Sequence, residues 1–227
     1  FGFIGCTGLL LLLGLIFGFK ETHKLSPADQ KATSTRLNVQ TVFKDRPFIC
    51  FVLIQGLVYG AMFCYISGSS FMLQNVFSLS KSTFSLIYGI NGIGIILMAE
   101  LSTVLINWFT ELEQLKLGLI GGLIGGFCIL ISGLGPNKLW LALIGLFLVV
   151  STLGLINAVV TSLALQRQGK QAGIASSVLG LGMYVFGIFL SPLVGIMGSY
   201  TYLPLAVLIL LCEFSALLLY RYVRRIV

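Results

Sequence analysis

Long apolar runs recur along the whole chain, and they constrain its fold more than any other feature. The first covers residues 1–19 and contains no charged residue. Six more cover approximately residues 47–73, 83–106, 117–134, 139–165, 172–197 and 202–220. A helix needs about 20 apolar residues to cross the hydrocarbon core of a bilayer. The runs therefore predict an all-α membrane protein with one leading helix and six further transmembrane helices.

The composition supports this prediction. Hydrophobic residues make up 57% of the chain and charged residues only 9%, whereas a soluble domain carries about 25% charged residues. A soluble fold of this length could not cover so much apolar surface. The net charge of +7 does not indicate nucleic-acid binding, because the basic residues lie at the ends of apolar runs rather than on one polar face. We expect the lipid bilayer as a partner, and no nucleic acid.

Lysine and arginine are distributed unequally between the two sides that the alternating runs define. One side carries Lys81 and Lys138 only. Because basic loops remain in the cytoplasm, we expect the other side, with its long loop and the C-terminus, to be cytoplasmic. Its twelve basic residues are Lys20, Lys24, Lys31, Arg36, Lys44, Arg46, Lys116, Arg167, Lys170, Arg221, Arg224 and Arg225.

Residues 20–46 form the longest polar stretch, and its Ser, Thr, Gln, Asp and Pro content is typical of a linker between two halves. The chain begins at Phe1, inside an apolar run and without an initiator methionine. We therefore expect a piece of a longer protein that opens partway into a helix.

Catalytic and cofactor sites are not indicated. The single histidine, His23, lies in the polar stretch, so a Ser-His pair in the membrane or a histidine-rich metal site lacks its residues. The five cysteines are scattered without a CxxC spacing, and there is no GxxxxGK[ST] loop for nucleotide phosphates. We expect no enzyme activity, no cofactor and no metal.

Polar residues inside the apolar runs are candidates for function, because they are costly in a membrane. Gln55, Tyr59 and Met62 form an i, i+4, i+7 stripe, with Tyr65 one turn further on. An amide, a phenol and a thioether together suit an amphiphilic ligand. Asn157 and Thr161 form a second polar pair at i, i+4 spacing. The alternative for both groups is helix packing with interhelical hydrogen bonds.

Glu100 is the acidic candidate, and we expect it about 9 Å inside its helix, counted at 1.5 Å per residue. It could bind a proton or substrate, or it could reach a structural partner or the interface. Asn91 lies nine residues earlier, which places it on the opposite helix face together with Tyr88. Glu213, in the last run, is expected to have a local partner.

Small residues indicate close helix packing. Gly118, Gly122 and Gly126 form one row in the fourth run, and Gly121 and Gly125 form another. The alternative is a smooth surface on which helices rock. Pro192 should kink its helix.

Three segments resemble one group of the major facilitator superfamily, the bicyclomycin-resistance (Bcr/CflA) multidrug-efflux group. FGFKETHK, with Glu21 and Thr22, is similar to the end of the sixth helix of that group. Residues Tyr65–Asn91 resemble its seventh and eighth helices, and Ser176–Gly195 its eleventh. The chain departs from the group at Lys20 and Ser70, where the group has proline, and Glu100 is not typical of the group.

The resemblance implies a twelve-helix, two-bundle fold with alternating access around a central cavity. Residues 1–19 would be the last helix of the N-terminal bundle, 20–46 the cytoplasmic linker, and 47–227 the C-terminal six-helix bundle. The runs that begin near residues 47, 83, 139 and 172 would line the cavity. The implied partners are a small hydrophobic or cationic substrate, protons and the N-terminal bundle.

The resulting functional hypothesis is proton-coupled drug efflux across the bacterial inner membrane. Two alternatives remain: a non-transporting scaffold or degenerate half-transporter, and an importer of a small metabolite. The expected proton-coupling residue is Glu100. The expected substrate-binding residues are Gln55, Tyr59, Met62, Tyr65, Tyr88, Asn91 and Asn157.

Overall fold

The computed structural model describes residues 2–18, 41–135, 138–197 and 201–227, and within them every regular element is a helix. The chain forms two units, Phe1–Asn38 and Val39–Val227, which are considered separately. The first contains α1 (Gly2–Gly18). Most of the expected linker, including His23 and the Glu21–Thr22 motif, lies outside the described residues.

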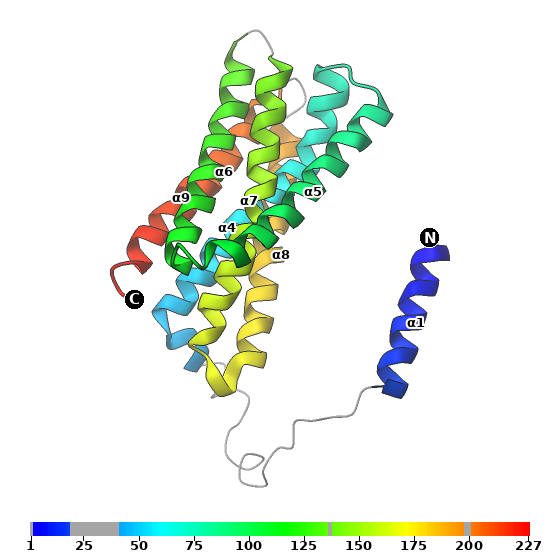
Figure 1. Ribbon diagram of the computed structural model, residues 1–227. Helices are drawn as coiled ribbons and strands as arrows, with labels where there is room; N and C mark the ends of the chain where they lie inside the picture. Colours follow the sequence, from blue (N-terminus) through cyan, green and yellow to red (C-terminus); the bar gives the residue numbers. More distant parts are fainter. Residues whose placement is uncertain (1, 19–40, 136–137, 198–200) are drawn as a thin grey trace. The chain divides into compact units, whose positions relative to one another are not determined.

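The second unit contains the six expected long helices (Figure 1). All six are long and apolar enough to span a membrane, so the prediction of an all-α membrane fold is confirmed. The elements are α4 (Arg46–Ser70), the π-helical turn η1 (Phe71–Val76), α5 (Lys81–Leu105), α6 (Glu111–Leu134), α7 (Leu139–Gln166), the 3₁₀ turn η2 (Gly169–Gln171), α8 (Ala172–Met197) and α9 (Leu203–Val223).

Capping residues set the helix starts. α6 begins six residues before the apolar run because Thr110 and Glu113 form a capping box. The Glu113 amide donates to Thr110 Oγ1 at 3.3 Å, and the Thr110 amide donates to Glu113 Oε2 at 2.9 Å. α5 starts after Ser80, whose hydroxyl accepts from the Thr83 amide at 3.1 Å. Pro47 lies in the first turn of α4, where it costs no hydrogen bond.

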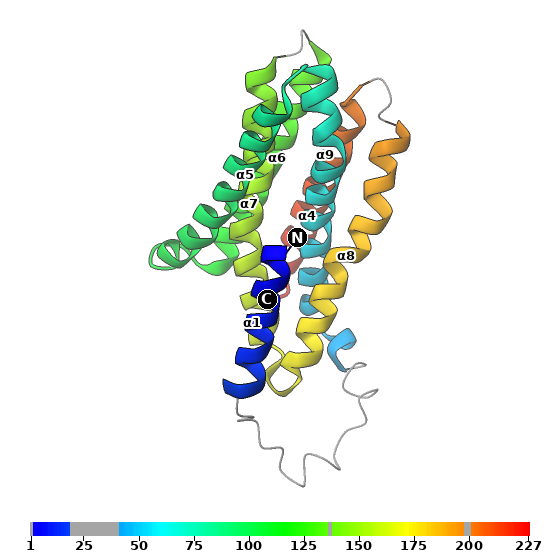
Figure 2. The same ribbon diagram turned by 90° about the vertical axis from the view of Figure 1, so that its right-hand side faces the viewer.

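Helices α4 and α7 lie at the centre of the bundle. They pack against each other and, together with α6 and α9, close a four-helix ring. Helix α5 packs on α7 and helix α8 on α4, and both lie on the side away from α6 and α9 (Figures 1 and 2). In the apolar stretch of α4 and of α7, 61% of the residues are buried, against 11% in α5 and 17% in α8. The unit therefore has an open side, where α5 and α8 flank α4 and α7, and a closed side made by α6 and α9.

Glycines allow the closed side to pack tightly, as the small-residue rows predict. A Cβ on Gly145 of α7 would lie 2.6 Å from the carbonyl oxygen of Gly125 on α6, so these two backbones are in direct contact. Gly121 faces Thr152 of α7, whereas Gly122 and Gly126 face α9. Gly118, in the same row as Gly122 and Gly126, faces Ile156 of α7, so only the second row faces a single neighbour. Helix α8 continues through Pro192 to Met197.

The ends of the bundle carry the residues typical of membrane interfaces. Trp108, after α5, and Trp140, at the start of α7, are both largely exposed and lie at opposite ends, as expected of an aromatic belt. Arg167 Nε lies 3.5 Å from Asp45 Oδ2, and Gln168 donates to the same oxygen at 2.9 Å. These contacts join the α7–α8 turn to the residue before α4.

Candidate functional site

Helices α4 and α7 share a polar group on the open side of the bundle. Gln55 Nε2 donates to Asn157 Oδ1 at 2.7 Å and to Thr161 Oγ1 at 3.3 Å. Gln55 is 1% exposed, and the other two side chains are half-buried. The amide oxygen of Gln55 has no hydrogen-bond partner among the described residues. We call Gln55, Asn157 and Thr161 the amide cluster.

A second polar group lies further along α4. Asn91 Nδ2, on α5, donates to the Tyr65 hydroxyl at 3.0 Å. The Tyr65 ring stacks on Tyr88, with centroids 5.1 Å apart, and Phe84 lies 5.2 Å beyond Tyr88. We call Tyr65, Tyr88 and Asn91 the tyrosine cluster. Its members were all expected from their helix faces, but the Tyr65–Asn91 hydrogen bond was not.

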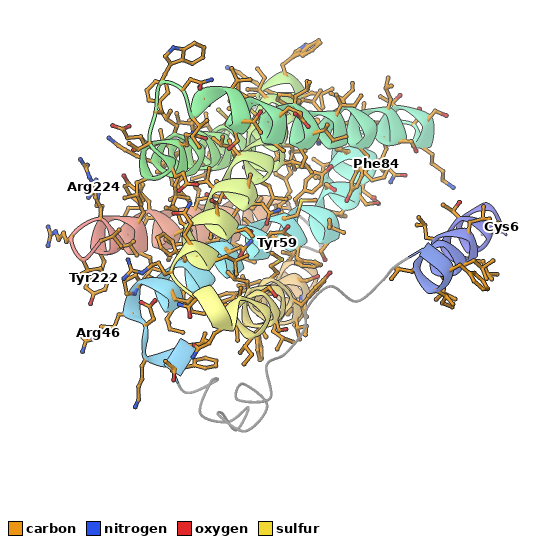
Figure 3. All side chains as sticks on the ribbon, turned by 60° about the horizontal axis from the view of Figure 1, so that its bottom comes forward. Cys6, Arg46, Tyr59, Phe84, Tyr222 and Arg224 are labelled. Atoms are coloured by element: carbon orange, nitrogen blue, oxygen red, sulfur yellow. The ribbon has the colours of Figure 1, made fainter. Side chains whose placement is uncertain are left out.

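Tyr59 and Met62 occupy α4 between the two clusters. Both are half-buried and pack against the apolar core. Figure 3 shows Tyr59 among the helices of the bundle rather than at its edge. The clusters are ten residues apart on α4, or about 15 Å at 1.5 Å per residue. One strip of α4 therefore presents an amide, a phenol, a thioether and a second phenol in succession.

The tyrosine cluster also adjoins a hollow between α5 and α7. The hollow has a volume of about 270 Å³, and Asn91 supplies the polar group in its wall. Its remaining lining residues are Ile87, Ile90, Trp140, Leu143, Ile144, Phe147 and Leu148. Such a space suits an apolar group rather than an ion.

Glu100 lies apart from both clusters. It is exposed on α5, and its carboxylate makes no hydrogen bond or ion pair with any described residue. Its backbone carbonyl accepts from Thr103 Oγ1 at 2.7 Å. Ile93 and Ile96 are exposed on the same side of the helix, whereas Asn91 is 3% exposed. The two residues therefore lie on opposite faces, as helical periodicity predicts.

Glu213, for which the sequence predicts a local partner, is a buried acidic residue of the bundle. It is fully buried on α9, and neither carboxyl oxygen has a hydrogen-bond partner among the described residues. A Cβ on Gly122 of α6 would lie 2.6 Å from Glu213 Oε2, so the carboxyl group fills the space that this glycine leaves. The expected local polar partner is not found in the described part of the chain. Glu213 lies on the closed side, away from the amide cluster.

The sequence model of the Major Facilitator Superfamily matches residues 1–192. The chain belongs to this superfamily. It is 30% identical over 190 residues to the uncharacterized MFS-type transporter YdgK of Bacillus subtilis (strain 168), covering 83% of this chain and 47% of YdgK. A second relative is the bicyclomycin resistance protein homolog of Haemophilus influenzae, 21% identical over 96% of this chain and 55% of that protein.

The fold agrees with the superfamily assignment. The crystal structure of the major facilitator transporter FucP, in the outward conformation, superposes with a TM-score of 0.73 at 16% identity. The match covers 95% of this chain and 51% of FucP. The chain thus has the fold of one half of a major facilitator transporter, and it spans about half the length of the relatives it matches. Membership of this superfamily supports a transporter role.

Proposed function

We propose that this chain is the C-terminal half of a transporter that exports hydrophobic or cationic compounds in exchange for protons. The observation that carries the proposal is the strip of α4, in which the amide and tyrosine clusters flank Tyr59 and Met62 on the open side of a membrane bundle. The open side would face the N-terminal half, with the transport pathway between them.

The chemistry of this strip suits a lipophilic substrate. Aromatic rings and a thioether give adaptable apolar contacts, and the faces of Tyr59 and Tyr88 can attract a cation. The amide oxygen of Gln55, which has no partner among the described residues, offers an acceptor for one polar group. The similarity to a bicyclomycin resistance protein homolog favours export of a drug over uptake of a nutrient.

Glu100 remains our candidate for proton coupling. It is an exposed carboxylate on α5, one of the two helices that flank the open side, so its carboxylate is accessible to a proton. We further propose that the protein lies in the bacterial inner membrane with its C-terminus in the cytoplasm. The imbalance of twelve basic residues against two supports this orientation.

Accumulation of fluorescent lipophilic cations tests the proposed export. Cells that express the full reading frame should hold several-fold less dye than control cells, and collapse of the proton gradient should remove this difference. Equal accumulation for several such cations, with and without the gradient, would contradict proton-coupled export. Higher accumulation in the expressing cells would instead indicate an importer.

The Glu100→Gln variant tests the coupling residue separately. If Glu100 carries the proton, the variant should reach the membrane in normal amounts and lose gradient-driven export. Glu111→Gln is the matched control, because Glu111 lies in the first turn of α6, which we expect at the cytoplasmic end, and accepts a hydrogen bond from Gln166. Normal export by Glu100→Gln would remove Glu100 from the mechanism and leave the export hypothesis intact.

A further inference from the structure

A groove between α6 and α9 on the closed side of the bundle has two chemically different ends. One end is a cavity of about 460 Å³ that contains four basic side chains. Further along the same two helices lies a second cavity of about 290 Å³ with a purely apolar lining. The first is lined by Lys116, Ile120, Leu217, Tyr220, Arg221, Arg224 and Arg225, and the second by Leu123, Phe127, Leu130, Val207, Leu210, Leu211 and Phe214.

Helical spacing places the two cavities in line along the same faces of α6 and α9, and together they make up the groove. On α6 the lining residues follow one another at intervals of three or four from Lys116 to Leu130, which keeps them on one face. On α9, which packs against α6, the lining continues in the opposite direction from Arg225 to Val207. The apolar part, from Ile120 to Leu130, is about 15 Å long at 1.5 Å per residue. That length equals about half of a hydrocarbon core of about 30 Å, or one leaflet.

The basic end has an excess of positive charge. None of Lys116, Arg221, Arg224 and Arg225 makes a hydrogen bond or an ion pair through its side chain with any described residue, and all four are exposed. Glu113 lies near Lys116 and Arg224, but its carboxylate is already engaged by the Thr110 amide and hydroxyl. Figure 3 shows Arg224 and Tyr222 projecting from this end of α9. This end of the groove therefore has four cationic side chains and one nearby carboxylate, Glu113, which is already hydrogen-bonded.

We propose that this groove binds an anionic phospholipid, with the phosphate among the four basic side chains and an acyl chain along Leu123, Phe127 and Phe214. The charge at one end and the one-leaflet length of the apolar part together fit a lipid better than a free anion or a helix. Guanidinium groups bind phosphate through paired hydrogen bonds, and basic residues beside a membrane surface attract anionic lipids. The groove faces away from the amide cluster, so this site is separate from the proposed transport pathway.

Lipid titration of the purified protein, followed by native mass spectrometry, tests the proposal. Long-chain phosphatidylglycerol should bind at least about tenfold more tightly than phosphatidylcholine with the same chains. Short-chain phosphatidylglycerol should bind more weakly than the long-chain lipid, and inorganic phosphate should not displace it. Equal binding of the two headgroups, or full displacement by inorganic phosphate, would overturn the proposal.

Charge-removing variants locate the site. The triple variant Lys116→Gln, Arg221→Gln, Arg224→Gln should lose the preference for phosphatidylglycerol. A control with the same loss of charge, Lys44→Gln, Lys81→Gln, Lys138→Gln, should keep it. Retention of the preference by the first variant would overturn the proposal. A dimer of the wild-type protein that this variant abolishes would also overturn it, because the groove would then bind a second copy of the chain. The substituted side chains are exposed and have no partner in the part of the chain that the structure describes, so we expect the variant to fold. If it folds poorly, the comparison of headgroups on the wild-type protein still decides the proposal.

Discussion

A carboxyl group in the interior of a membrane bundle is costly unless it has a partner, and Glu213 has none among the described residues. Gln55 differs, because its amide nitrogen donates to both Asn157 and Thr161, although its amide oxygen also has no partner among the described residues. Both residues are fully buried polar side chains in apolar helices. Their difference indicates that the amide cluster contributes to stability, whereas Glu213 reduces it.

Replacement of Glu213 with methionine should therefore stabilise the protein. Methionine is unbranched and flexible, so it can occupy the space beside Gly122 without a polar group. We expect a gain of about 1–3 kcal/mol, the usual cost of an unsatisfied buried polar group, measured as a higher thermal unfolding midpoint in detergent. Glu111→Met, at a half-buried position bonded to Gln166, should give no gain. A lower midpoint for Glu213→Met would show that the carboxyl group has a favourable role.

At the scale of helices, direct backbone contact decides which glycines can be replaced. Gly145 and Gly125 hold α6 and α7 so close that a Cβ on Gly145 would lie 2.6 Å from a backbone oxygen. Gly180 of α8 has nothing within 4 Å of the corresponding position. Glycine therefore fixes a helix crossing at position 145 and has no packing role at position 180 among the described residues.

The Gly145→Ala variant should lower the thermal unfolding midpoint, with a loss of about 1–3 kcal/mol from overpacking. Neither the backbone of α6 at Gly125 nor that of α7 at Gly145 can move without disturbing the whole contact between the two helices. Gly180→Ala is the control and should be neutral or slightly stabilising, because alanine favours a helix more than glycine does. Equal midpoints for the two variants would contradict the close contact described for α6 and α7.

The sequence predicted the helices well because apolar runs of the required length directly reflect the thickness of a bilayer. It placed the start of α6 too late, because Glu111 and Glu113 are polar although they belong to the capped first turn. Helical periodicity also separated Asn91 from Glu100. It could not pair Gln55 with Asn157, since these residues are 102 positions apart and their contact depends on how α4 and α7 cross.

At the scale of the whole molecule, the six-helix unit has an open side with polar clusters, a closed side with a basic groove, and two ends that differ in charge. The end with Arg46, Lys116, Arg167 and Arg224 is strongly basic, while the opposite end carries Lys81 and Lys138. This difference predicts the orientation of the bundle in the membrane.

Reporter fusions in the full reading frame test this orientation. Alkaline phosphatase inserted between α6 and α7 should be active, because we expect that connection outside the cytoplasm. The same enzyme fused after Val227 should be inactive. The reverse pattern of activity would contradict the proposed orientation.

The central claim is that the open side of α4 and α7 binds the transported compound, and export by an Asn157→Leu variant tests it most directly. Leucine has the same branching and number of side-chain heavy atoms as asparagine but cannot accept the hydrogen bond from Gln55. The control is Thr152→Val on the same helix, because Thr152 bonds only to backbone carbonyls of α7 among the described residues and faces Gly121 of α6.

Export of a lipophilic cation should fall at least several-fold in Asn157→Leu and stay near the wild-type rate in Thr152→Val, with both proteins present in the membrane at wild-type amounts. Wild-type export by Asn157→Leu would contradict the claim that the amide cluster belongs to the substrate site.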